Sequence, residues 1–175
     1  MPVAGLRALD AGASTGGFTD CLLQRGAASV VALDVGRGQL HERLRADPRV
    51  MVRERCNVRD VTLEQLGAAP FPLIVADLSF ISLTTVASPL VSLAADDADL
   101  VVLIKPQFEV GRAVASRGKG VVRDTGDRWG AIERVRGAFE ASEAVMIGLM
   151  ASPLTGADGN VEFLAHLRAP ARGAV

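Results

Sequence analysis

A glycine-rich turn between an apolar run and a helix-forming run constrains this chain more than any other feature. Leu6–Leu9 is apolar, Asp10 follows it, and the small residues 11–17 include three glycines before Phe18–Arg25 begins a helical pattern. Glycines let a ligand approach the backbone closely, and the free amides of a helix start favour polar or negative groups. The turn therefore predicts a cradle for a nucleotide or nucleoside.

Short β-branched runs alternate with amphipathic segments along most of the chain. The expected strands are Leu6–Asp10, Ser29–Val35, Val50–Arg55, Leu73–Leu78, Leu100–Lys105, Ala144–Ala151 and Val161–Arg168. The expected helices are 17–25, 39–46, 62–67, 83–95 and 125–141. Continuous Val/Ile/Leu strands separated by helices indicate a mostly parallel sheet covered on both faces.

The last two expected strands differ from the others because no helix fits between them. Residues 152–160 are rich in turn-forming types and too short for a crossover helix, so these strands should form an antiparallel hairpin. A mostly parallel seven-stranded sheet with a C-terminal antiparallel hairpin and helices on both faces is the α/β, Rossmann-like class I methyltransferase fold. We expect residues 1–175 to form a single domain of this kind.

Composition narrows the possible functions. The net charge of −1 means that any nucleic-acid contact must rest on a local basic patch. Two distant cysteines and two histidines argue against a metal site and a disulfide framework, and they favour a reducing, cytoplasmic location. No apolar run approaches the roughly 20 residues of a spanning helix, so no membrane role is expected.

Two polar positions follow the second and third expected strands. Asp34 lies about 20 residues after the glycine turn, where an acid in a doubly wound sheet faces the ribose hydroxyls of a nucleoside. Asn57 and Asp60 follow the third strand, where the base of such a ligand would lie. An acid at a loop and a plain turn remain the structural alternatives.

Three charged residues stand where the later strands begin or end. Asp77 ends the fourth expected strand, Lys105 ends the fifth, and Glu162 lies at the start of the last. The carboxyl edge of such a sheet is where ligands bind, and a lysine there, beside a carboxylate, can accept a proton from a hydroxyl. A structural ion pair at the strand ends is the alternative interpretation.

The long segment Pro106–Arg123 is glycine-rich and basic, which suggests a binding loop. Its candidate RNA-phosphate contacts are Arg112, Arg117, Lys119 and Arg123. Because acids are interleaved just beyond it, a solvated charged face explains the same pattern. His41 and His166 receive no role.

Two rival interpretations of the glycine turn are weaker. Residues 12–16 match the Gly-x-Ser-x-Gly elbow of serine hydrolases, but the elbow normally follows several earlier strands and an upstream glycine loop. A nicotinamide-binding domain needs Gly-x-Gly-x-x-Gly, and Ser14 occupies the second glycine position.

Four motifs in order resemble one family. They are Asp10–Thr19, Val75–Ser82, Lys105–Gly111, and the pair Ser152-Pro153 with Gly159–Glu162. Over nearly the whole chain the sequence resembles the TlyA family of FtsJ-like ribosomal RNA methyltransferases, also labelled hemolysin A.

The resemblance implies methyl transfer from S-adenosyl-L-methionine to ribose 2′-hydroxyls of ribosomal RNA, in free RNA or in ribosomal subunits. The family's Lys-Asp-Lys-Glu active site maps its last three members onto Asp77, Lys105 and Glu162. The cofactor residues would be Asp10, Ala11, Gly12, Ser14, Gly16, Gly17, Phe18, Asp34, Asn57 and Asp77. No metal is expected.

Two departures from the family qualify these expectations. The family's first catalytic lysine and its small RNA-binding domain lie upstream of the glycine turn, and nothing here matches them, so we expect a truncated chain with impaired methylation. The alternatives are a module that binds the cofactor without catalysis and, taking the hemolysin label literally, a membrane-lytic protein. The chain has no strongly cationic amphipathic helix to support the latter.

Overall fold

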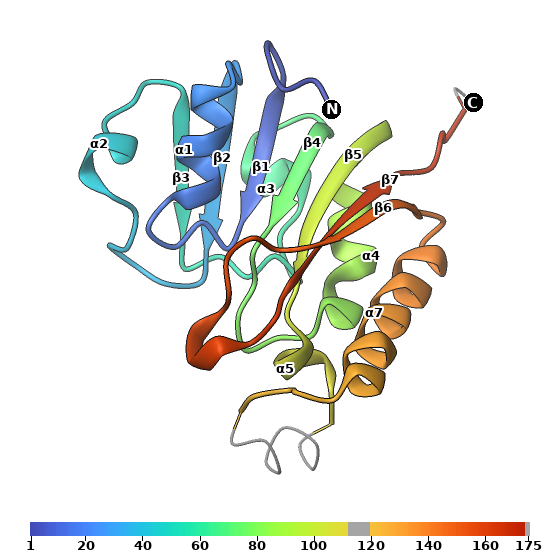
Figure 1. The fold of residues 1–175 in the computed structure, drawn as a ribbon. Helices are drawn as coiled ribbons and strands as arrows, with labels where there is room; N and C mark the ends of the chain where they lie inside the picture. Colours follow the sequence, from blue (N-terminus) through green and yellow to red (C-terminus); the bar gives the residue numbers. More distant parts are fainter. Residues whose placement is uncertain (112–119, 174–175) are drawn as a thin grey trace.

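Seven strands form one sheet with the order β3-β2-β1-β4-β5-β7-β6 (Figure 1). The computed structural model describes residues 1–111 and 120–173. The strands are β1 (Arg7–Ala11), β2 (Ser29–Asp34), β3 (Val50–Glu54), β4 (Phe71–Ala76), β5 (Ala94–Ile104), β6 (Val145–Ala151) and β7 (Phe163–Arg168). The first five pair in parallel, and β7 is antiparallel to both β5 and β6. The predicted sheet with its C-terminal hairpin is confirmed.

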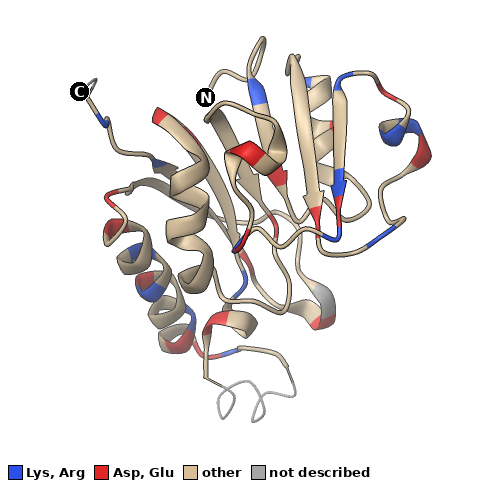
Figure 2. Ribbon diagram, turned by 180° about the vertical axis from the view of Figure 1, so that it is seen from behind, with Lys and Arg blue, Asp and Glu red and all other residues tan. Residues whose placement is uncertain are grey.

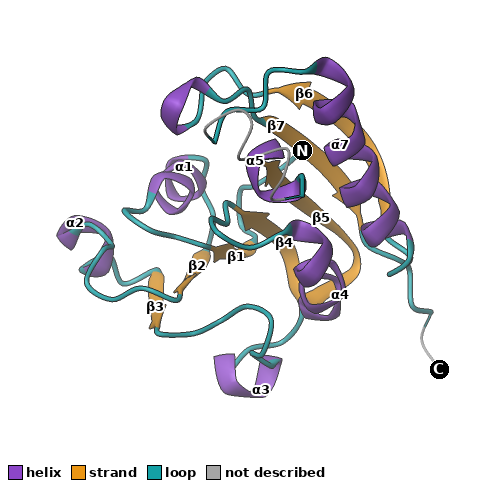
Figure 3. Cartoon of the chain, turned by 90° about the horizontal axis from the view of Figure 1, so that it is seen from below, coloured by secondary structure: helices purple, strands orange, loops and turns teal. Residues whose placement is uncertain are grey.

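Helices cover both faces of this sheet (Figure 3). They are α1 (Gly17–Gln24), α2 (Glu42–Arg45), α3 (Leu63–Leu66), α4 (Leu83–Leu93), α5 (Pro106–Glu109) and α7 (Thr125–Glu140), with a short 3₁₀ turn η1 (Ala157–Gly159) before β7. Helix α1 lies on one face, whereas α3, α4 and α7 lie on the other. At several helix starts a side chain accepts a hydrogen bond from a backbone amide, as Ser82 does for α4 and Asp124 for α7.

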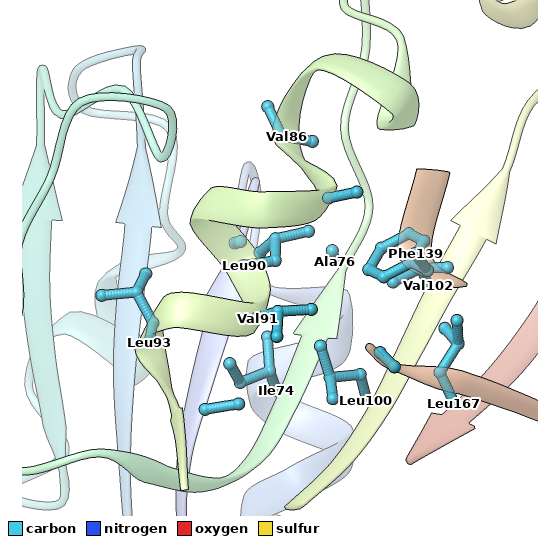
Figure 4. Close-up of a cluster of buried hydrophobic side chains, with 14 of the residues drawn as sticks. Ile74, Ala76, Val86, Leu90, Val91, Leu93, Leu100, Val102, Phe139 and Leu167 are labelled. Carbon is cyan, nitrogen blue, oxygen red and sulfur yellow. The ribbon is translucent and has the colours of Figure 1, made fainter. Parts of the chain in front are cut away.

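Neighbouring residues of the central strands face different cores. Ala8 and Val30 pack with α1, whereas Leu9 and Val31 belong to the larger core on the α4 and α7 side. Figure 4 shows part of that larger core, with side chains of α4 against those of β4, β5 and β7. This double burial is why the central strands are mostly apolar and lack an alternating pattern.

Several boundaries differ from the expected ones, and the differences at β4, β5 and α5 lie near the later strand ends. Strand β5 begins at Ala94, directly after α4, whereas the expected strand began at Leu100. Its first part pairs with Phe71 through a register shift, so β4 also begins two residues early. The expected loop after Lys105 starts with the short helix α5, whose first residue is Pro106, a position that suits proline.

Gly12 tests how strictly the turn after β1 needs glycine. Its φ is +85°, and a Cβ there would overlap the carbonyl oxygen of Asp77, whereas a Cβ at Gly17 would meet no atom within 4 Å. Gly12→Ala should therefore lower the free energy of unfolding by about 2 kcal/mol or more, and Gly17→Ala by less than about 0.5 kcal/mol. Urea denaturation measures both variants, and equal losses would contradict this account of the turn.

Candidate active site

The turn after β1 brings three strand ends together. The amide of Gly12 donates to the carbonyl of Leu33 in β2 (2.8 Å), and the amide of Asp77, just past β4, donates to the carbonyl of Ala11 (3.0 Å). The missing side chain at Gly12 leaves room for the Asp77 carbonyl. The backbone of β1, β2 and β4 therefore converges on a single point at the carboxyl edge of the sheet.

A cleft of about 530 Å³ opens at this point. Its lining includes five of the predicted cofactor residues, namely Gly12, Ser14, Asp34, Asn57 and Asp77. Apolar side chains such as Leu33, Val58 and Ile81 form the rest of the wall together with Gln39, Cys56 and residues 78–80. A mostly apolar cleft with a few polar groups is typical of a small-molecule site.

Asp34 is anchored by backbone amides on both carboxylate oxygens. The amide of Ser14 donates to Oδ2 (2.8 Å), and the amide of Gly36 donates to Oδ1 (2.7 Å). A carboxylate oxygen accepts more than one hydrogen bond, so these contacts fix the group while leaving acceptor capacity for hydroxyls. Asn57 also lines the cleft, and its side-chain oxygen accepts from the amide of Arg59 (3.0 Å), which shapes the turn after β3.

Asp10 lies below the turn and is fully buried. The hydroxyl of Thr19 donates to its Oδ2 (2.6 Å), while its Oδ1 has no hydrogen-bond partner among the described residues. Burial raises the pKa of Asp10 to about 6; the Thr19 hydrogen bonds oppose this shift, and the charges of Asp77 and Asp34 add to it. A buried carboxylate beside two others favours a positively charged neighbour.

The other predicted cofactor residues lie around the cleft rather than in its wall. Ala11 belongs to the larger core, and Phe18 packs against the core on the α1 side. Gly16 and Gly17 line a second hollow at the start of α1, together with His41 and Arg43. Gly16 also has a positive φ (106°), which suits its place at the helix start. Their cofactor roles stay predictions.

Lys105 and Asp77 form an ion pair beside the cleft. The two residues follow the last residues of neighbouring parallel strands, and Lys105 Nζ lies 2.6 Å from Asp77 Oδ1. Lys105 Nζ also donates to Ser79 Oγ (3.0 Å), and the lysine side chain is only 13% exposed. The chain has only two lysines, Lys105 and Lys119, so a lysine here stands out among many arginines.

Glu162 stands just before β7 and is 7% exposed. Its Oε1 accepts a hydrogen bond from Gln107 Nε2 of α5 (3.0 Å), and the structure records no ion pair between Glu162 and Lys105, both of which it describes. Gln107 is the residue that the sequence argument missed. Its place two positions after Lys105 was the available signal.

Two aromatic rings flank the same region. Phe80 is 91% exposed, lines the cleft and has a positive φ of 64°, and its ring lies 5.3 Å from that of Phe108. A large apolar side chain rarely adopts such a backbone conformation or such exposure without a functional reason. No pattern in the sequence predicts the contact between these two rings.

The predicted RNA contacts are only partly visible. Arg112, Arg117 and Lys119 lie outside the described residues, and Arg123 is exposed. Basic and acidic residues alternate along α7, as Figure 2 shows, so this helix carries no uniformly positive face. Among the described residues, no cluster of three or more His, Cys, Asp or Glu side chains is arranged to hold a metal ion.

The two histidines have structural contacts. The Nδ1 atom of His41 accepts a hydrogen bond from the amide of Arg43 at the start of α2. The Nε2 atom of His166 lies 2.7 Å from Asp99 Oδ1, which Arg168 also contacts. Within residues 1–111 and 120–173, no helix is long and apolar enough to cross a bilayer.

Solved structures place this sheet in a known class. An S-adenosylmethionine-dependent methyltransferase from Mesorhizobium loti superposes with a TM-score of 0.67 at 17% identity, covering 96% of this chain and 93% of that one. A candidate hemolysin from Lactococcus lactis is closer, with a TM-score of 0.92 and 41% identity over 96% of this chain and 80% of that one. The fold is thus that of the class I S-adenosylmethionine-dependent methyltransferases.

Sequence comparison identifies the family. The family model of the FtsJ-like methyltransferases matches residues 2–169, so the chain belongs to this family. The 16S/23S rRNA (cytidine-2′-O)-methyltransferase TlyA of Mycobacterium tuberculosis is 54% identical over 96% of the chain. Hemolysin A of Brachyspira hyodysenteriae is 43% identical over 90% of the chain. The chain spans 62% and 65% of the lengths of these two relatives.

The buried carboxyl of Asp10 predicts a pH-dependent stability. Because its folded-state pKa of about 6 exceeds the ordinary 3.8, its contribution to stability is greatest below pH 4 and is lost as the pH rises through 6. From pH 5 to pH 8, the wild type should lose about 1–2 kcal/mol of unfolding free energy relative to Asp10→Asn.

Urea denaturation at both pH values measures this difference. Asp47→Asn is the matched control, because Arg49 holds the pKa of the exposed Asp47 down at about 2, below the range tested. Parallel pH dependence of the wild type and Asp10→Asn would show that Asp10 ionises normally.

Proposed function

We propose that this chain binds S-adenosylmethionine in the cleft and transfers its methyl group to a ribose 2′-hydroxyl of ribosomal RNA. The observation that carries the proposal is the Lys105–Asp77 ion pair beside a cleft whose turn is built on Gly12. The names of the relatives that act on rRNA support the substrate class. Such a substrate also agrees with the cytoplasmic location that the cysteine content predicts.

The residues of the cleft fit the cofactor. Its volume of about 530 Å³ lies within the usual range of small-ligand sites. Asp34 offers fixed acceptors for ribose hydroxyls, and the bare backbone at Gly12 permits close approach. The carboxylates of Asp10, Asp34 and Asp77 complement the positive charge of a sulfonium and an ammonium group.

When bound, S-adenosylmethionine supplies a methyl group activated by its positively charged sulfur. Lys105 orients the ribose hydroxyl for in-line attack. Asp77 and Ser79 hold the Nζ atom of Lys105 in place. The proton released from the hydroxyl passes to the lone pair of Lys105 Nζ, where Asp77 stabilises the resulting ammonium, and then to water. Positioning by these side chains supplies much of the rate, since the methyl group is already activated.

An exposed aromatic ring suits an RNA substrate. Phe80 stands at the cleft with its ring open to solvent, and Phe108 supports it from α5. Unpaired RNA bases stack on such side chains, which holds the nucleotide while its sugar enters a site. We infer that Phe80 receives a base of the RNA next to the reacting ribose.

Asp34 tests cofactor binding. Asp34→Ala removes the ribose acceptor, so the Kd for S-adenosylmethionine should rise about 10- to 100-fold in isothermal titration calorimetry. Asp47→Asn is the matched control, because Asp47 likewise accepts an amide two residues on but lies outside the cleft lining. An unchanged Kd for Asp34→Ala would remove Asp34 from the cofactor site.

Substitution of Lys105 tests its catalytic role. Lys105→Met should lower the methylation rate of ribosomal RNA about 100-fold or more, while the cofactor Kd changes less than about threefold. Tritium transfer from labelled cofactor measures the rate. Cofactor binding by the wild type without any transfer would instead support the inactive binding module, and an unchanged rate for Lys105→Met would exclude Lys105 from catalysis.

A further inference from the structure

We infer that Gln107 is a positioning residue for Glu162, holding its carboxylate in one orientation beside the Lys105–Asp77 pair. The inference deepens the proposed function and rests on it. Gln107 Nε2 donates to Glu162 Oε1 at 3.0 Å, across 55 positions of sequence. The contact joins α5 to the residue before β7, and the next residue, Phe163, pairs with Ile104, the residue before Lys105.

The main chain at Glu162 is already fixed without Gln107. The amide of Ser152 donates to the Glu162 carbonyl (2.8 Å), and the neighbouring Asn160 binds the amide of Val122 and the carbonyl of Gly120 through its side chain. What remains free is the rotation of the Glu162 side chain. The hydrogen bond from Gln107 removes that freedom.

Glu162 also needs space, which Gly156 provides. A Cβ at Gly156 would overlap Glu162 Oε1, the same oxygen that accepts from Gln107. The carboxylate therefore occupies a slot between the turn of residues 152–160 and α5. On the α5 side, the amide of Gln107 contacts this carboxylate.

The orientation of the Gln107 amide follows from the chemistry of its partner. The NH₂ group faces Glu162, because Gln107 Nε2 can only donate and a carboxyl oxygen accepts. The Gln107 Oε1 atom is buried and has no hydrogen-bond partner among the described residues. Leaving an amide oxygen unpaired costs stability, which is reasonable where the other half of the amide holds a functional group.

Helix α5 gives this contact a direct connection to Lys105. Gln107 is two residues after Lys105, and Glu109 at the end of the helix accepts from the Leu83 amide and the Ser82 hydroxyl at the start of α4. The helix is thus tied to α4 at one end. The Gln107 hydrogen bond therefore links the Glu162 carboxylate to the helix that follows Lys105.

A double-mutant cycle in the full chain tests the role. Gln107→Met keeps the length of the side chain and removes the donor, and Glu162→Met removes the acceptor, with Glu162→Leu as a second background without an acceptor should Glu162→Met not fold. Gln107→Met should lower kcat for RNA methylation about 10- to 100-fold, while KM for RNA and the cofactor Kd stay within twofold. In the Glu162→Met background the same substitution should change kcat less than twofold.

Gln24→Met is the matched control, because Gln24 donates to Asp20 on the exposed surface of α1 and its loss should leave kcat unchanged. An equal kcat loss from Gln107→Met in both backgrounds, or a loss confined to KM, would overturn the positioning role.

A wild type that transfers no methyl group would reject the proposed function without deciding this inference. In that case, the double-mutant cycle is measured by the midpoints of urea denaturation. A midpoint shift from Gln107→Met that disappears in the Glu162→Met background supports the contact, and an equal shift in both backgrounds overturns it.

Discussion

The close approach of Gly12 to Asp77 is the constraint on which the site depends. With no Cβ at Gly12, the Asp77 carbonyl packs against the turn, and the amide of Asp77 bonds to Ala11 at the end of β1. One backbone junction therefore forms the floor of the cleft and fixes the carboxylate that pairs with Lys105. Under the proposed function, the cofactor site and the reacting groups therefore share a single structural origin, so a change at this glycine would affect both.

Helix α5 is the second junction, and it is only four residues long. Together with the lysine before it, it contacts four separate parts of the site: Lys105 with Asp77 and Ser79, Gln107 with Glu162, Phe108 with Phe80, and Glu109 with the start of α4. A helix this short has little intrinsic stability, so these contacts determine its position. The side chains near the reacting hydroxyl are consequently held by one another more than by the helix.

Sequence predicted those features that follow from a single residue's place at a strand end. Asp34, Asp77 and Lys105 could be placed because parallel strands end at one edge. The Gln107–Glu162 bond was not predictable, since it joins residues far apart in sequence and depends on side-chain rotation. The start of β5 at Ala94 was missed because pairing of Ala94 with Phe71, at the start of β4, overrides the low strand propensity of the acidic residues in β5.

The acidic character of the cleft has a consequence for turnover. Burial is the main cause of the raised pKa of Asp10, and repulsion from the charges of Asp77 and Asp34 adds to it. Under the proposed function, the positive sulfur of the cofactor relieves that repulsion, whereas the product has a neutral sulfur and relieves less of it. Electrostatics therefore favours the methyl donor over the demethylated product at the same contacts. Under the proposed function, such a site binds the methyl donor partly through the positive charge on its sulfur. Part of that affinity is lost when the methyl group is transferred.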